Sequence, residues 1–117
     1  MISSIGSIAV LVSDSEKSKK WYVEKLGFSI HENLDHWVTV GPSGSAIVLH
    51  LCQTEELEPG NTGITLRAED LEGTYRVLRD RGVEFTRELA ASEWDPNMNY
   101  AMLKDPDGNE FWLLASD

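Results

Sequence analysis

The chain repeats one pattern twice, and this repeat constrains its fold more than any other feature. The two copies are SIAVLVSDSEKSKKWYVEKLGFSI (7–30) and GITLRAEDLEGTYRVLRDRGVEF (63–85). Ile8 matches Ile64 and Asp14 matches Asp70, and the members of each pair are 56 positions apart. A repeat of this length predicts two copies of one supersecondary unit that stabilise each other within a domain.

Each copy begins with a strand signal followed by a helix signal. The mostly apolar run at 8–12 predicts a strand that is covered on one face and faces a pocket on the other. Ser13 and Glu16 have capping-box spacing, and Asp14 is itself a good N-cap residue, so a helix is expected to begin here. Gly27 can adopt the left-handed conformation that ends helices, and a matching glycine follows the second helix.

Three further strands are expected after each helix. They are predicted at 28–32, 37–40 and 46–53 in the first copy, and at 83–89, 100–104 and 110–115 in the second. The predicted turns are Asn33–Leu34–Asp35, Gly41–Pro42–Ser43–Gly44 and Asp105–Pro106–Asp107–Gly108. The predicted fold is therefore α+β, with two βαβββ modules and the helices on one face of the sheets. We expect one domain over 1–117, with a first module at about 5–53, a linker at 54–61 and a second module at about 62–116.

Composition narrows the possible partners and the cellular location. Twenty acidic residues against ten basic ones give a net charge of −10, which argues against nucleic-acid and anionic-membrane partners. No apolar run approaches the roughly 18–20 residues of a membrane span, and the N-terminus lacks a signal-peptide pattern. The single cysteine, Cys52, fits a reducing compartment, so a cytoplasmic location is expected.

The order of elements, the helix entry VLVSDSEKSKKWYVEKLGF and the terminal DPDGNEFWL together resemble the vicinal-oxygen-chelate superfamily. This superfamily includes glyoxalase I, extradiol dioxygenases and bleomycin-resistance proteins. The resemblance covers roughly residues 5–115. It implies that the paired modules curve their sheets into a cup, that the cup is the ligand site, and that a second subunit often completes it. A homodimer is therefore expected.

The resemblance also implies a divalent metal held by His and Glu side chains from four strands. In this sequence the four positions fall on Ser7, His50, Gly63 and Trp112. Glycine has no side chain, the indole N–H only donates, and a neutral serine is a poor ligand. One histidine leaves an ion without the three or four ligands that zinc sites require. The expected metal site is therefore absent, and we predict no cofactor.

Two other groups of polar residues are candidate sites. The segment HENLDH (31–36) brings two histidines and two acidic residues together, but it spans a predicted hairpin and lacks the HExxH spacing. Glu110 shares a strand face with Trp112, and together with His50 it would make a pair suited to acid–base chemistry. The alternative function is thus a glyoxalase-like lyase, isomerase or dioxygenase with a non-standard site around His50 and Glu110.

Strand alternation places Glu110, Trp112 and Leu114 on one face of the last strand. The family resemblance implies that this face points into the cup. The residues expected to bind a ligand are Trp112, His50, Trp94, Tyr100, Glu110, Trp37 and Met98. Such a cup suits a flat, apolar or cationic molecule, bound by stacking and cation–π contacts. The predicted function is a metal-independent small-molecule-binding protein, similar to the branch that sequesters antibiotics. A cup filled by its own rings, which would leave an interaction module, is the competing interpretation.

Overall fold

The computed structural model describes residues 1–116, and Asp117, the last residue of the predicted domain, lies outside the described residues. The chain divides into two compact units, Met1–Glu58 and Pro59–Asp117. Each unit contains a strand, a helix and three more strands, and each forms one four-stranded mixed sheet. The α+β fold with two βαβββ modules, predicted from the repeat, is therefore confirmed. Within residues 1–116, no helix is long and apolar enough to span a membrane.

The first unit consists of β1 (Ser7–Val12), α1 (Ser15–Leu26), β2 (Ser29–Leu34), β3 (Trp37–Gly41) and β4 (Val48–Gln53). Its strand order is β1-β4-β3-β2, with β1 parallel to β4 and the other pairs antiparallel. The helix contacts β3 and β4. Val12, Tyr22 and Val40 have no exposed surface, so the core of the unit lies between this helix and the sheet.

Local signals explain both ends of α1. The Asp14 carboxylate accepts hydrogen bonds from the amides of Glu16 and Lys17, so Asp14 rather than Ser13 is the N-cap. At the other end Gly27 has φ 73°, and its N–H donates to the carbonyl of Val23. This left-handed conformation closes the last turn of the helix as predicted.

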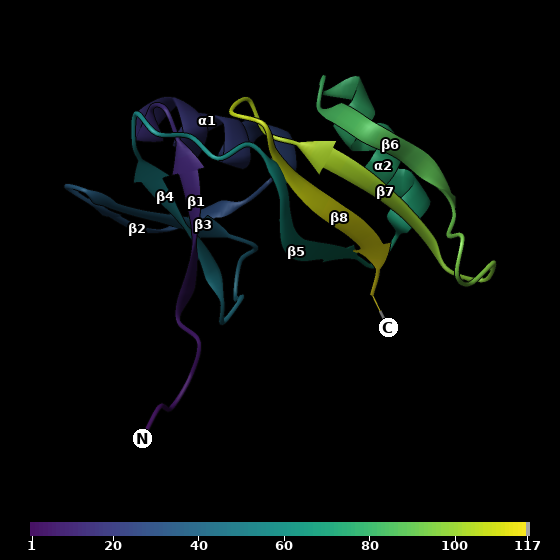
Figure 1. Ribbon diagram of the computed structural model, residues 1–117, viewed down its shortest axis with the longest axis horizontal. Coiled ribbons are helices and arrows are strands. Elements are labelled where there is room, and N and C mark those ends of the chain that lie inside the picture. The colour runs from purple at the N-terminus through teal and green to yellow at the C-terminus, as the bar shows by residue number, and fades with distance from the viewer. Residues whose placement is uncertain (117) are drawn as a thin grey trace. The chain divides into compact units, whose positions relative to one another are not determined.

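The second unit consists of β5 (Gly60–Ala68), α2 (Leu71–Asp80), β6 (Glu84–Ala91), β7 (Asn99–Lys104) and β8 (Asn109–Ala115). Its strand order is β5-β8-β7-β6, and the green-to-yellow part of Figure 1 shows β6, β7 and β8 side by side. Phe111 and Leu113 are buried, whereas Glu110, Trp112 and Leu114 are half-buried. The predicted alternation along β8 therefore holds, and Trp112 lies on the more open face of this sheet.

Several strand ends differ by one or two residues from the sequence-based expectation, and two of these differences change where the chain turns or pairs. The turn predicted at Asn33–Leu34–Asp35 is wrong, because Leu34 still pairs with Trp37 and the chain turns at Asp35 and His36. His36 adopts φ 61°, and the ladder continues through Asn33 because strand pairing outweighs the turn preference of a single asparagine. In addition, β5 begins at Gly60, inside the stretch expected as a linker, where its N–H donates to the Gly108 carbonyl.

Candidate functional site

The open face of the second sheet carries a ladder of large side chains. Trp112 on β8 and Arg87 on β6 both lie opposite Met102 of β7, one on each side of that strand. Tyr100 is two residues from Met102, so its side chain projects from the same face. Diagonal neighbours of this kind lie within reach of aromatic and long side chains. The Tyr100 and Trp112 rings are stacked, with centroids 4.8 Å apart and planes at 17°.

Trp94 adds a third ring to this surface. Its centroid lies 5.2 Å from that of Tyr100 and 5.8 Å from that of Trp112. Trp94 is 57% exposed, whereas Tyr100 is only 6% exposed. We call Trp94, Tyr100 and Trp112 the aromatic wall. Its buried member is the central ring, and its accessible surface comes from the two tryptophans.

The loop that carries Trp94 is held by its own hydrogen bonds. The Ser92 amide donates to the Met98 carbonyl at 2.8 Å, which closes the loop at its base. The buried Ser92 hydroxyl donates to the Asp95 carbonyl at 2.6 Å and accepts from the Asp95 amide at 3.0 Å. Met98 is half-buried at the end of this loop. These hydrogen bonds within the loop hold the backbone on both sides of Trp94 in one conformation.

Arg87 covers the aromatic wall from the β6 side. Its Cζ lies 3.7 Å from the Tyr100 ring centroid, a cation–π distance, and it donates to the Tyr100 carbonyl. It also forms an ion pair with Glu93 at 3.4 Å. The pKa of Glu93 lies below the ordinary value for a glutamate. The main cause is a hydrogen bond from the backbone amide of Glu93 to its own carboxylate, and Arg87 and the Tyr100 hydroxyl act in the same direction.

The first unit has a smaller aromatic surface. The Trp37 and His50 rings are stacked with centroids 4.0 Å apart and planes at 28°, and we call them the Trp37–His50 pair. The Trp37 indole donates to Glu32 at 3.0 Å, and the Thr39 hydroxyl donates to the same carboxylate oxygen at 3.4 Å. His50 Nε2 is buried and has no hydrogen-bond partner among the described residues. A group that enters beside this pair would therefore find a free hydrogen-bonding nitrogen.

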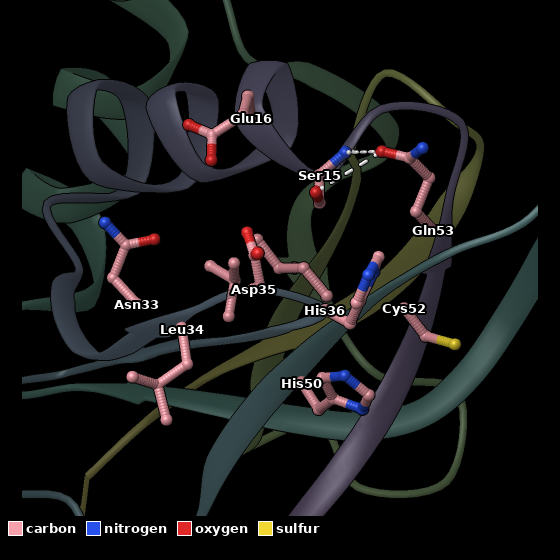
Figure 2. Close-up of a pocket in the computed structure, with 11 residues that line it drawn as sticks. Ser15, Glu16, Asn33, Leu34, Asp35, His36, His50, Cys52 and Gln53 are labelled. Carbon is pink, nitrogen blue, oxygen red and sulfur yellow. Dashed lines mark hydrogen bonds between the residues drawn. The ribbon is translucent and has the colours of Figure 1, made fainter.

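A pocket of about 750 Å³ opens beside the Trp37–His50 pair (Figure 2). Its position follows from the sheet, because the β3–β4 pairing ends at Thr39 and His50. The lining residues are Ser15, Glu16, Asn33, Leu34, Asp35, His36, Val38, His50, Leu51, Cys52 and Gln53. In Figure 2 the Asp35 and His36 side chains lie between the hairpin and the first turn of α1. The lining contains two carboxylates, Glu16 and Asp35, and neither lysine nor arginine. Lys19 pairs with Glu16 at 2.6 Å from outside the lining, so the preference for a cation over an anion rests on Asp35.

The first turn of α1 does not offer an anion site to this pocket. Gln53 Oε1 accepts from the Ser15 amide at 2.9 Å and from the Ser15 hydroxyl at 3.3 Å (dashed lines in Figure 2). Asp14 takes the next two amides, as described above. The N–H groups that would bind a phosphate or carboxylate ligand are therefore already satisfied by the protein's own side chains.

The four positions that family members use for a metal do not fit an ion here. Ser7 lies opposite Val48 in the β1–β4 ladder, two residues from the Ala9–His50 pair. Gly63 has φ 75° and sits in a bulge of β5. The Trp112 indole donates to Asn61 at 3.3 Å. Across residues 1–116, no group of three or more His, Cys, Asp and Glu side chains is placed to hold a metal.

The predicted site residues fall into two groups. Trp94, Met98, Tyr100, Glu110 and Trp112 lie in the second unit, and Trp37 and His50 lie in the first. The proposed acid–base partners His50 and Glu110 thus belong to different units, and Glu110 lies opposite Lys104 in the β7–β8 ladder. Sequence reasoning missed Arg87, because register shifts on both sides of it in β6 remove the simple alternation by which a strand face is recognised.

Comparison with known proteins gives consistent matches over nearly the whole chain. The family model of the Glyoxalase/Bleomycin resistance protein/Dioxygenase superfamily matches residues 4–113. The uncharacterized protein YetH of Bacillus subtilis (strain 168) is 34% identical over 123 residues, covering 97% of this chain and 98% of that protein. A superfamily member from Sphaerobacter thermophilus DSM 20745 has a TM-score of 0.88 and 32% identity, with 98% of both chains covered. TnmS3, an antibiotic binding protein from Streptomyces sp. CB03234, has a TM-score of 0.78 and 32% identity, with 99% of this chain and 98% of that chain covered.

Proposed function

Because the chain belongs to the glyoxalase/bleomycin resistance protein/dioxygenase superfamily, we propose that it is a metal-independent protein that binds a flat aromatic or cationic small molecule. Sequestration of a compound such as an antibiotic is the role we propose within this class. TnmS3, which matches almost the full chain, is an antibiotic binding protein, and this supports the proposal.

The observation that carries the proposal is the aromatic wall. Trp94 is stacked on the buried Tyr100, yet 57% of its surface is exposed. It therefore contributes little to the core and presents an apolar ring to solvent. Trp112 extends the same surface. Offset stacking of a ligand ring on such a platform contributes about 0.5–1.5 kcal/mol beyond the burial of apolar area.

A preference for cationic ligands is supported by the charge distribution. Glu16 and Asp35 line the pocket in the first unit, and the Trp37–His50 pair beside it offers a ring face. The whole chain has a net charge of −10, which raises the local concentration of cationic solutes. An ammonium or guanidinium group beside Asp35 would gain a charge-assisted hydrogen bond, whereas one beside Glu16 would compete with Lys19, which pairs with that carboxylate at 2.6 Å.

Metal independence is supported by the chemistry of the four family positions. Gly63 supplies no donor atom, and Trp112 supplies an N–H that already donates to Asn61. Ser7 would be a weak neutral ligand, which leaves His50 as the one strong donor of the four. Binding through ring faces and carboxylates needs no metal ion.

We also propose that the protein acts in the cytoplasm as a homodimer. The free Cys52 thiol is compatible with a reducing compartment, and dimers follow the family pattern stated above. The negative charge disfavours nucleic-acid and anionic-membrane partners, which would need a basic surface.

Calorimetric titration of purified protein with three planar or ring-bearing probes tests the proposal. The probes are proflavine, a planar cation, anthraquinone-2-sulfonate, a planar anion, and bleomycin. We expect proflavine to bind more tightly than the sulfonate, and each of Trp94→Ala and Trp112→Ala to weaken binding about tenfold, which corresponds to about 1.4 kcal/mol. Treatment with EDTA should leave the affinity unchanged.

Trp21→Phe is the matched control, because Trp21 lies on α1, packs edge-on against Tyr22 and is not one of the three rings of the aromatic wall. The Trp21→Phe variant should bind proflavine with the same affinity as the unchanged protein. Loss of binding on EDTA treatment would contradict metal independence. Equal affinity of the unchanged protein and both alanine variants, or no binding of any probe, would contradict the proposed site.

A further inference from the structure

The Tyr100 ring is enclosed on both of its faces. The strand order β8-β7-β6 places Trp112 on one side of Tyr100 and Arg87 on the other. The Trp112 centroid is 4.8 Å from that of Tyr100, and the guanidinium carbon of Arg87 is 3.7 Å from it. A ligand would therefore contact Trp94 and Trp112, whereas Tyr100 supports these rings from behind.

Arg87 connects the backbones of two neighbouring strands, β6 and β7, next to the aromatic wall. Its guanidinium donates to the carbonyls of Glu88 and Ala90 at 3.2 and 3.3 Å, and to that of Ala91 at 3.0 Å. It also donates to the Tyr100 carbonyl at the start of β7. The β6–β7 register shifts between Arg87 and Ala90, so one rigid fork ties together the irregular end of β6 and the strand beside it.

Glu93 extends this network to the loop that carries Trp94. One carboxylate oxygen accepts from Arg87, and the other accepts from the Tyr100 hydroxyl, each at 3.4 Å. Glu93 precedes Trp94 in the chain, so a fixed Glu93 limits where the Trp94 backbone can lie. Glu93 is charged at neutral pH, as glutamates ordinarily are, and its lowered pKa lets the carboxylate go on accepting both bonds in more acidic solution.

We infer that Arg87 is the positioning residue of the aromatic wall: it fixes the Tyr100 ring against Trp112 and, through Glu93, holds the 92–98 loop so that Trp94 stays stacked on Tyr100 and next to Trp112. Arg87 acts through these side chains and does not itself touch the ligand. The effect on ligand binding rests on the proposed function, whereas the effect on ring geometry does not.

Far-UV circular dichroism tests the geometry, because closely stacked aromatic rings give an exciton couplet that depends on their distance and angle. We expect Arg87→Met to lose more than half of the couplet amplitude while the protein remains folded, and Arg87→Lys to give an intermediate amplitude. Lysine keeps a charge near the Tyr100 ring but lacks the planar fork that binds several carbonyls. Proflavine affinity should fall about five- to tenfold in Arg87→Met.

Arg76→Met is the matched control, since Arg76 is an exposed residue of α2 and should leave both the couplet and the affinity unchanged. If Arg87→Met does not fold, Glu93→Ala decides, because Glu93 is exposed and its loss removes the link to the loop. A full couplet in folded Arg87→Met, or in Glu93→Ala when only that variant folds, would overturn the inference.

The two proposals fail in different ways. A couplet lost in Arg87→Met, with no planar probe bound by the unchanged protein, supports the positioning role and contradicts the proposed function. Probe binding that persists in Arg87→Met together with a full couplet contradicts the positioning role and leaves the proposed function intact.

Discussion

Asp105 supports the last turn of the second unit as a buried hydrogen-bond acceptor. It is 2% exposed. One of its carboxylate oxygens accepts from the amides of Asp107 and Asn109, both at 2.9 Å, and the other accepts from the Asn109 side chain at 2.8 Å. This carboxylate therefore shapes the turn that leads into β8, the strand that carries Trp112.

Replacing Asp105 with alanine should lower the free energy of unfolding by about 2–4 kcal/mol, because at least three donors lose a charged acceptor in a buried place. Urea denaturation followed by circular dichroism measures the change. Asp80→Ala is the control, since Asp80 is exposed at the end of α2, and it should stay within about 0.5 kcal/mol of the unchanged protein. A loss below about 1 kcal/mol for Asp105→Ala would show that the turn holds without this carboxylate.

The sequence indicates this turn but not the role of its first residue. Pro106 and Gly108 predict a turn because their backbone preferences are local. Burial of Asp105 depends on neighbours brought by the fold, and composition carries no sign of it. The same reason applies to the candidate site. Strand alternation predicts the face of Trp112, and the family resemblance predicts the places of Trp94 and Tyr100. Arg87 and Glu93 act through contacts that the bulged register of β6 conceals.

At the level of elements, the helices follow the sequence more closely than the hairpins do. Asp14 and Gly27 mark the two ends of α1 because caps are satisfied within a few residues. The β2–β3 turn depends instead on how far two strands pair, and Leu34 pairs with Trp37 beyond the predicted limit. The observed turn at Asp35 and His36 matters for the candidate site, because both residues line the pocket.

Gly27→Ala should lower the free energy of unfolding by about 1–2 kcal/mol, since a side chain at φ 73° is strained and the C-cap of α1 requires that conformation. Thermal and urea unfolding measure the loss, and Gly27→Asn should recover part of it because asparagine tolerates this conformation better. Gly6→Ala is the control, because nothing lies within 4 Å of an added Cβ there and φ is not in the left-handed region. Equal destabilisation by both alanine substitutions would mean that the cap conformation is not the cause.

At the level of the whole molecule, the internal repeat determines the architecture and leaves the two halves free to differ in chemistry. The first unit carries an acidic pocket beside the Trp37–His50 pair, and the second carries the aromatic wall with Arg87 behind it. The repeat predicts that both units share one topology, which they do. It does not predict which unit carries the acidic pocket and which carries the aromatic wall, because that depends on residues at which the two copies diverge.

Net charge bears directly on the proposed homodimer. Two copies that each carry −10 repel each other, and raising the salt concentration from about 0.01 M to 0.1 M shortens the screening length from about 30 Å to 10 Å. The dimer dissociation constant should therefore fall at least fivefold over this range, as measured by sedimentation equilibrium. The triple variant Glu55→Gln, Glu56→Gln and Glu58→Gln, at exposed positions between β4 and β5, should strengthen association at low salt and show a weaker salt dependence. A mass of one chain, 13.1 kDa, at every salt concentration would contradict the dimer, and association that weakens with salt would mean that opposite charges across the interface outweigh the repulsion.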